Sequence, residues 1–199
     1  VALVGLAVTV IGGAGDGRMG MRAFWFGGET PVAFLIASFV GGIAFAVFFT
    51  YVVYGFSTTS MPENLRSLLG GPLAKLHAAA IALHLMFVLG RAVTGLWSNA
   101  EGLQVWQHIT SQPLFYFGLI GGTIVPLLLM AMPSTRPQAW AQVVASLLVM
   151  IGLLISRYEF IIGGQQVPLF KGSWAQGLGQ YTPFLTEWAL LLVGILRAN

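Results

Sequence analysis

Three ionisable side chains recur at a seven-residue interval in the sequence: His77, His84 and Arg91. Seven residues are almost two turns of an α-helix, so the side chains fall on one face, about 10.5 Å apart along the axis with a drift of about 20° per step. The surrounding run, from about Leu73 to Ser98, is otherwise apolar, and Ser98 continues the series. Because a charged stripe against lipid is costly, we predict that this face is directed into a helical bundle.

Several kinds of chemistry fit this stripe. Histidines of membrane helices can bind b-type haem, but each haem usually needs a second histidine from another helix. The remaining histidine, His108, lies in the connection after this helix, so a two-haem cytochrome b is excluded within this chain and one haem is the least favoured interpretation. The other two interpretations are a proton path or contact with a quinone headgroup, and hydrogen bonds that only join helices.

A second group of ionisable residues lies near the end of the chain. Arg157 and Glu159 follow the apolar run 139–156, and Glu187 lies in the second turn of a run that Tyr181 opens. Such groups cost several kcal/mol at membrane depth unless they are paired or hydrated, which makes them functional candidates. The alternative is that Arg157 and Glu159 anchor a helix end at the lipid headgroups.

The composition requires membrane helices to position these residues. Hydrophobic residues make up 57% of the 199 residues and charged residues 8%, with a mean hydropathy of +0.84, so lipid must solvate most of the apolar surface. Counting apolar runs predicts an all-α bundle of about six transmembrane helices in a single domain, residues 1–199. The first run, Val1–Gly13, and the last, Pro183–Leu196, are too short to span about 30 Å of hydrocarbon, so we expect part of a longer subunit.

The individual helices have recognisable signals. Thr30 as a cap and Pro31 as the first helical residue predict a helix that continues to about Phe56. Its small residues predict close contact with another helix; they are Ser38, Gly41 and Gly42. Three further segments are a short surface helix at Pro62–Leu69, an interfacial loop with an amphipathic turn at Asn99–Gln112, and a helix at Pro113–Met132 that Pro126 kinks.

The charges indicate orientation and exclude other classes. One side of the predicted bundle carries Arg66, Lys75, Arg136 and Arg197, and the other carries Arg18, Arg22 and Lys171. We expect the first side to be cytoplasmic, which places Arg91, Arg157, Glu159 and Glu187 toward the outer face. Arg157 and Glu187 are then predicted to form an ion pair. A net charge of +3 does not favour nucleic acid, and no HExxH or GxSxG motif of a protease occurs.

Three stretches resemble one family of membrane subunits. The last two runs carry the residues Arg157, Tyr158, Gly164, Gln165, Tyr181, Pro183, Glu187 and Trp188. Two further stretches are TPVAFLIASFVGGIA, at residues 30–44, and GGTIVPLLL, at residues 121–129. Together they resemble the NrfD/polysulphide-reductase family of integral membrane subunits, of which this chain looks like the C-terminal part.

The resemblance implies a function that the chain does not perform alone. Such subunits anchor an iron–sulfur, ferredoxin-like protein, often with a molybdopterin or multihaem catalytic subunit, in the bacterial cytoplasmic (inner) membrane. They exchange electrons with menaquinone or ubiquinone without a haem of their own, and the absence of cysteine excludes a cysteine-ligated cluster here. We therefore expect no haem or metal in this chain. The candidate quinone or proton-path residues are His77, His84, Arg91, Arg157, Gln165, Tyr181 and Glu187.

Alternatives to a quinone site remain open. In this family the quinone pocket belongs to an earlier bundle of four helices, so the present residues could line a proton route or a packing seam instead. The chain would then be a structural or proton-conducting half of the complex. A b-type cytochrome or a transporter subunit is a further alternative, although a transporter should have helices that are broken at mid-membrane.

Overall fold

The computed structural model describes residues 10–11, 29–97 and 100–166, whose regular secondary structure is entirely helical. Four helices in these ranges are long and apolar enough to cross a membrane: Thr30–Val53, Glu63–Leu96, Pro113–Ala131 and Ala139–Ile162. The predicted all-α membrane class is confirmed, but the count of six helices is not. Of the first predicted helix only Val10 and Ile11 are described, both helical, and the last lies outside the described residues.

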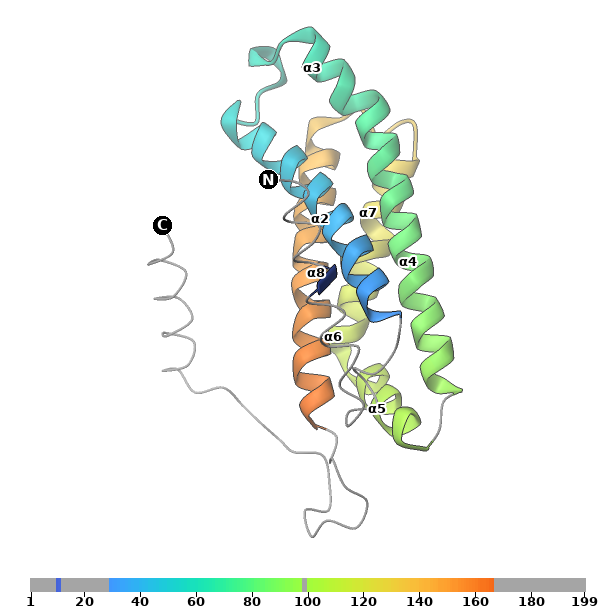
Figure 1. The fold of residues 1–199 in the computed structure, drawn as a ribbon. Helices are drawn as coiled ribbons and strands as arrows, with labels where there is room; N and C mark the ends of the chain where they lie inside the picture. The colour runs from blue at the N-terminus through green and yellow to red at the C-terminus, as the bar shows by residue number, and fades with distance from the viewer. Residues whose placement is uncertain (1–9, 12–28, 98–99, 167–199) are drawn as a thin grey trace, which may run out of the picture.

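The four spans form a ring. α2 (Thr30–Val53) packs against α4 (Ala74–Leu96) and α8 (Ala139–Gln166), and α7 (Val125–Ala131) packs against the same two helices from the other side (Figure 1). α5 (Ala100–Ser111) lies across one end and contacts α4 and α8. Because α2 and α4 run in opposite directions, the start of α2 and the end of α4 share this end of the bundle.

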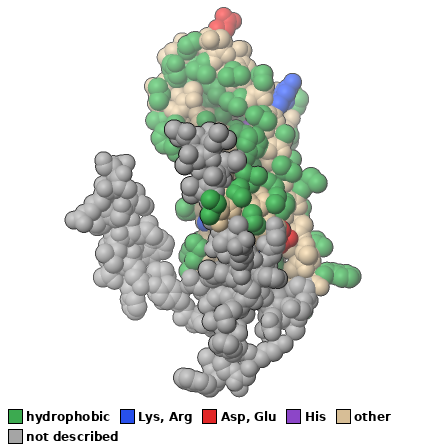
Figure 2. Space-filling view, viewed as in Figure 1, with side chains coloured by type: hydrophobic (Ala, Val, Ile, Leu, Met, Phe, Trp, Pro, Cys, Tyr) green, Lys and Arg blue, Asp and Glu red, His purple; other side chains and the backbone are tan. Residues whose placement is uncertain are grey.

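Apolar side chains cover both the inside and the outside of this ring. The core contains small and branched residues with almost no exposed surface; among them are Val40, Ala44, Ile81, Ala141 and Val149. On the outside, Val53, Leu154 and Met86 remain more than two-thirds exposed, at 78%, 72% and 71%. Hydrophobic side chains dominate the described part of the face in Figure 2. Such a surface suits lipid as the solvent.

The segment before α4 corrects one prediction. Pro62–Leu69 is not a separate surface helix, because α3 (Glu63–Leu68) continues through the π-helical turn η2 (Leu69–Leu73) directly into α4. Pro72 lies inside this turn. A proline lacks the N–H of a helical residue and its ring clashes with the carbonyl four residues before it, and the wider π turn accommodates both. The sequence Gly70-Gly71-Pro72 therefore coincides with a change from α-helical to π-helical hydrogen bonding, but the helix continues.

The third span departs from α-helical geometry next to Pro126, where a kink was predicted. It consists of α6 (Pro113–Tyr116), the π-helical segment η3 (Phe117–Ile124) and α7, with Pro126 at the start of α7. The hydroxyl of Thr123 donates to the carbonyl of Gly118 at 3.3 Å, five residues back. The structure therefore has a long π-helical segment before Pro126, and the kink at the proline itself stays a prediction.

Two more boundaries differ from the predictions. Residues 99–112 were expected to form a loop with one amphipathic turn, but most of them form the 12-residue helix α5. The helix expected to end at Ser156 continues to Gln166, so Arg157 and Glu159 lie within α8 and not at its end. Both predictions gave too much weight to polar residues, which a helix tolerates when they face water or the interior of the bundle.

α2 begins and ends almost where its sequence suggests. Pro31 occupies its first turn, but Glu29 and not Thr30 is the cap residue. The helix ends at Val53, before the expected Phe56, because Gly55 and Phe56 adopt left-handed φ angles of 61° and 58°. A short 3-10 turn, η1 (Thr58–Ser60), leads from there to α3.

Small residues set the helix contacts only in part as predicted. Gly41 faces α8, and a Cβ atom there would lie 3.0 Å from Leu153 Cδ1. Ser38 is exposed and Gly42 has open space beside it, so neither makes the predicted contact. A close approach between two backbones lies elsewhere, between Gly122 of η3 and Gly152 of α8.

Candidate functional site

A cavity of about 100 Å³ lies among α2, α4, α5, η3 and α8, toward the end of the bundle that α5 covers. We call it the α8 cavity, because α8 contributes three of its six polar lining residues. Its polar lining residues are His84, Arg91, Thr123, Ser156, Arg157 and Glu159. Its aromatic lining residues are Phe34, Phe87, Trp106, Phe115 and Phe160. The site therefore combines hydrogen-bond donors with flat apolar walls.

The polar stripe of α4 faces the interior, as its spacing predicts. His77 is 1% exposed and lies in the core of the bundle, and His84 and Arg91 line the α8 cavity one and two intervals further along. Ser98 lies outside the described residues. His77 does not line the cavity, so the structure brings together only two of the three predicted residues on this helix.

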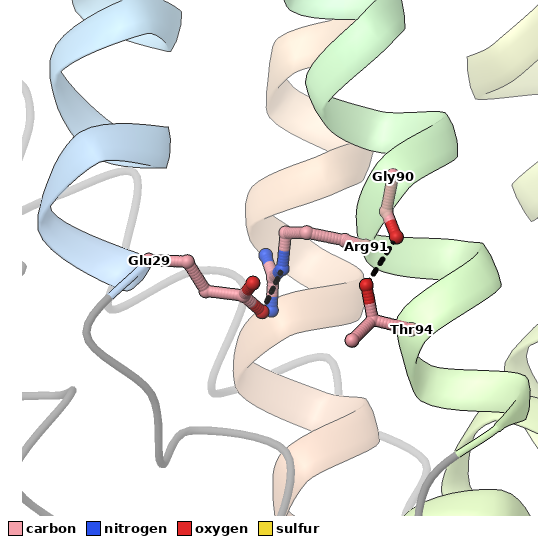
Figure 3. A network of polar contacts seen from close by, with 4 residues as sticks. All are labelled: Glu29, Gly90, Arg91 and Thr94. Atoms are coloured by element: carbon pink, nitrogen blue, oxygen red, sulfur yellow. Dashed lines mark hydrogen bonds and ion pairs between the residues drawn. The ribbon is translucent and has the colours of Figure 1, made fainter.

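Arg91 has a partner that sequence reasoning missed. Its Nε lies 3.4 Å from Oε1 of Glu29, the residue at the N-cap position of α2 (Figure 3). Arg91 is 17% exposed and Glu29 is 45% exposed, so the pair spans the boundary between the interior and the surface. The start of α2 also favours a carboxylate electrostatically. The sequence did contain a signal for this pair. Glu29 directly precedes Thr30, where the helix was expected to begin, and this start lies at the same end of the predicted bundle as Arg91.

Arg157 and Arg91 are linked through two aromatic rings. The guanidinium carbon of Arg157 lies 3.6 Å from the ring centroid of Phe34, and that of Arg91 lies 5.8 Å from the centroid of Phe160. The two rings pack edge to face, with centroids 5.5 Å apart. Both guanidiniums are within the range of cation–π attraction, which partly offsets the cost of keeping them inside the bundle.

Glu159 lies within α8 and lines the same cavity. Its Oε1 atom is buried and accepts no hydrogen bond from the described part of the chain. This position does not support the interpretation of Glu159 as a headgroup anchor at a helix end. The predicted convergence of charged residues is thus present for Arg91, Arg157 and Glu159.

The remaining predicted site residues cannot be placed with them. Gln165 belongs to α8, but its side chain is outside the described residues, as are Tyr181 and Glu187. The ion pair between Arg157 and Glu187 therefore stays a prediction.

A second polar group lies toward the opposite end of the bundle, and the sequence did not single it out. Tyr51 donates its hydroxyl to Oε1 of Gln142 at 2.9 Å, and Nε2 of Gln142 donates to the backbone carbonyl of Arg136 at 2.8 Å. Tyr51 and Gln142 are almost fully buried. Polar residues inside an apolar run, such as Gln142 and Ser146, were the available signal.

The site does not have the composition of a metal centre. Within the described ranges, no group of three or more His, Cys, Asp or Glu side chains could hold a metal ion. What the α8 cavity can do is donate hydrogen bonds from His84, Arg91 and Arg157 to a flat polar molecule and exchange protons through Glu159.

Comparisons with known proteins extend this description. The family model described as "Polysulphide reductase, NrfD" matches residues 1–168. A selenate reductase subunit from Mesobacillus selenatarsenatis is 27% identical over 210 residues, which cover 98% of this chain and 47% of that protein. The chain thus spans about half the length of the curated relative that it matches. No solved structure matches it significantly.

Proposed function

The chain belongs to the polysulphide reductase NrfD family, and from this premise we propose that it is part of the membrane anchor of a respiratory oxidoreductase complex. In this role it exchanges electrons between the quinone pool and an iron–sulfur partner subunit. The name of the relative, which is one subunit of a selenate reductase, supports membership of a multi-subunit reductase. Because these 199 residues contain no cysteine, they supply no thiolate ligand to the iron–sulfur cluster of the partner subunit.

The observation that carries the proposal is the donor set of the α8 cavity. A quinone headgroup is a flat ring with carbonyl oxygens on opposite edges, and those oxygens accept hydrogen bonds. His84, Arg91 and Arg157 supply donors within membrane-spanning helices, and aromatic side chains supply flat walls. Quinone reduction takes up protons and quinol oxidation releases them, and the carboxyl group of Glu159 lies where it can serve this exchange.

The size of the cavity favours a second candidate function as well. A cavity of about 100 Å³ is smaller than the ~150 Å³ that holds one benzene ring, but it has room for about three water molecules. With its carboxylate, imidazole and guanidinium groups, a hydrated cavity of this size suits a proton route without a quinone. The chain would then be the proton-conducting half of the complex.

Photolabelling distinguishes these two functions. We expect an azidoquinone analogue, photolysed with the purified complex, to label peptides of α2, α4 and α8 that contain Phe34, His84 or Arg157, and excess unlabelled quinone to prevent it. Labelling confined to other peptides would contradict the quinone site here and favour the proton route. Extraction of the same sample for quinone, haem and metal tests whether quinone is its cofactor and whether the chain lacks haem, as we propose.

The partners and the location follow from the same proposal. A ferredoxin-like subunit with a molybdopterin or multihaem catalytic subunit would complete the complex, which we place in the bacterial inner membrane. Co-purification of such subunits with a tagged copy of the full-length protein is the direct test.

A further inference from the structure

His77 belongs to the polar stripe of α4 but does not line the α8 cavity. Its side chain is 1% exposed, and its Nε2 atom has no hydrogen-bond partner among the described residues. Ser146 of α8 is 0% exposed, and its Oγ atom also lacks a partner within the part of the chain that the structure describes. Buried polar atoms are almost always hydrogen-bonded to protein or to ordered water, so a partner for these two atoms is expected.

A constant register between α4 and α8 places these two side chains opposite each other. Both helices run toward the end that α5 covers, on opposite sides of the ring that α2 and α7 complete (Figure 1). The guanidinium carbon of Arg91 lies 5.8 Å from the ring centroid of Phe160, a residue 69 positions further along the chain. His77 and Ser146 have the same separation, and each lies 14 residues before its counterpart in that contact. Equal steps along two α-helices keep the depth and the face of both partners.

Two further contacts support this register. His84 and Leu153, which have the same separation in the chain, both line the α8 cavity. Before α4, a Cβ atom on Gly70 would lie 3.5 Å from the Cα atom of Pro137 and 3.9 Å from Nε2 of Gln142. The counterpart of Gly70 in this register is position 139, which lies between those two residues. The register therefore holds from one end of the bundle to the other.

The hydroxyl of Ser146 is available for a bond across the bundle. Thr50 of α2 donates its hydroxyl to the carbonyl four residues back, as hydroxyls in membrane helices often do. Oγ of Ser146 makes no such bond within the described residues. On α4, the buried residues one turn before and after His77 are Ala74 and Ala80, whose single methyl groups fill little of the interior beside the imidazole.

We propose that an ordered water molecule lies between His77 and Ser146 and hydrogen-bonds to both, so that it joins α4 to α8 across the bundle. The inference does not depend on the proposed function. Water suits the site because it both donates and accepts, so it serves the hydroxyl and either tautomer of the imidazole. The bridge lies outside the α8 cavity and holds together two helices that contribute to its wall.

A double-mutant cycle tests the bridge by thermal unfolding of the purified full-length protein in detergent. Loss of one polar atom leaves the other and the water with an unmade bond, so we expect Ser146→Ala and His77→Leu each to lower Tm by about 2–6 °C. The double variant removes both polar atoms and should lose less than the two shifts together. The matched control combines His77→Leu with Ser38→Ala, whose shifts should add because Ser38 is exposed on α2.

Additive shifts for His77→Leu and Ser146→Ala, or a rise in Tm with either one, would refute the bridge. Independent packing gives additive shifts, and replacing a polar atom that has no partner at all raises stability.

X-ray hydroxyl-radical footprinting distinguishes the water from a direct bond between the two side chains, since radicals form from water at the site. We expect His77 to be oxidised although it is buried, and Ser146→Val, whose methyl groups take the place of the water, to lose most of this oxidation. Tyr51 is the reference for a buried side chain without a water, because its hydroxyl donates directly to Gln142. Oxidation of His77 no greater than that of Tyr51 in the wild-type protein would refute the water, whether or not Ser146→Val assembles.

Discussion

The charged residues of the α8 cavity differ in their surroundings. Arg91 reaches Glu29 at the rim, Arg157 stacks on Phe34, and Glu159 presents a carboxylate oxygen to the interior. Since Glu29 is 45% exposed, its ion pair with Arg91 resembles a surface pair, which typically contributes less than about 1 kcal/mol. The pair therefore orients Arg91 more than it stabilises the fold.

A double-mutant cycle on this pair measures that contribution. We expect Glu29→Gln to change the free energy of unfolding little. Arg91→Leu should change it more, because Arg91 is only 17% exposed. The coupling energy between the two residues should be about 1 kcal/mol or less. Thermal unfolding in detergent at low and high salt is the measurement. A coupling of about 3–5 kcal/mol, insensitive to salt, would instead indicate a fully buried pair.

His84 is the residue whose replacement best tests the chemistry of the cavity. If its imidazole transfers a proton or hydrogen-bonds the quinone, His84→Leu should lower quinone-linked turnover, by about 100-fold for proton transfer, and should leave assembly almost intact. His108→Leu is the control, because His108 lies on α5 and does not line the cavity. Failed assembly with normal turnover per assembled complex would favour the interpretation that His84 only joins helices.

At the scale of helices, two features shape the cavity wall. The π-helical segment η3 contributes Gly118, Leu119 and Thr123 to the lining. The same segment reaches α8 at Gly122 and Gly152, where two glycines allow the backbones to touch. The irregular helix therefore lies where two backbones pack directly against each other, and π-helical segments are frequent at functional sites.

Gly152→Ala tests this crossing. The added Cβ would lie 2.6 Å from the Cα atom of Gly122, and backbone cannot yield as a flexible side chain can, so we expect a loss of about 1–3 kcal/mol in unfolding free energy. Gly42→Ala is the matched control, because nothing lies within 4 Å of its Cβ position and a helix favours alanine. Equal stability of the two variants would show that η3 and α8 are not in such close contact.

The whole molecule has two unlike ends. One end carries Arg66 in α3, Lys75 at the start of α4 and Arg136 in the turn before α8, together with the buried contacts of Tyr51 and Gln142. The other end holds Glu29, α5 and the α8 cavity. By the distribution of positive charge, we expect the first end to face the cytoplasm and the cavity to lie toward the outer side.

The absence of cysteine makes this orientation simple to test. We expect Ser134→Cys, in the exposed turn before α8, to react with a membrane-impermeant maleimide only after spheroplasts are lysed. Gln112→Cys, exposed between α5 and α6, should react in intact spheroplasts. The reverse pattern would invert the topology. The unmodified protein serves as the control for background labelling.

Much of the architecture could be predicted from local properties of the sequence. Apolar runs of about 20 residues identify the membrane spans, because a helix of that length crosses the hydrocarbon core. The runs must be helical, because the lipid offers no hydrogen-bond partner to backbone N–H and C=O groups. The interval from His77 to Arg91 places these residues on one face, and the cost of charge in lipid directs that face inward. Neither inference needs knowledge of which helix lies beside which.

Only the tertiary structure determined the partners of these residues. Glu29 meets Arg91, Phe34 meets Arg157, and the hydroxyl of Tyr51 meets Gln142, 91 residues away in the chain. Such contacts depend on the neighbours and depth of each helix, which many weak packing contacts decide together and no local pattern encodes. The course of the helix through Pro72 also involves tertiary contacts, because Leu69 of the π turn is buried and a Cβ at Gly70 would lie 3.5 Å from Pro137.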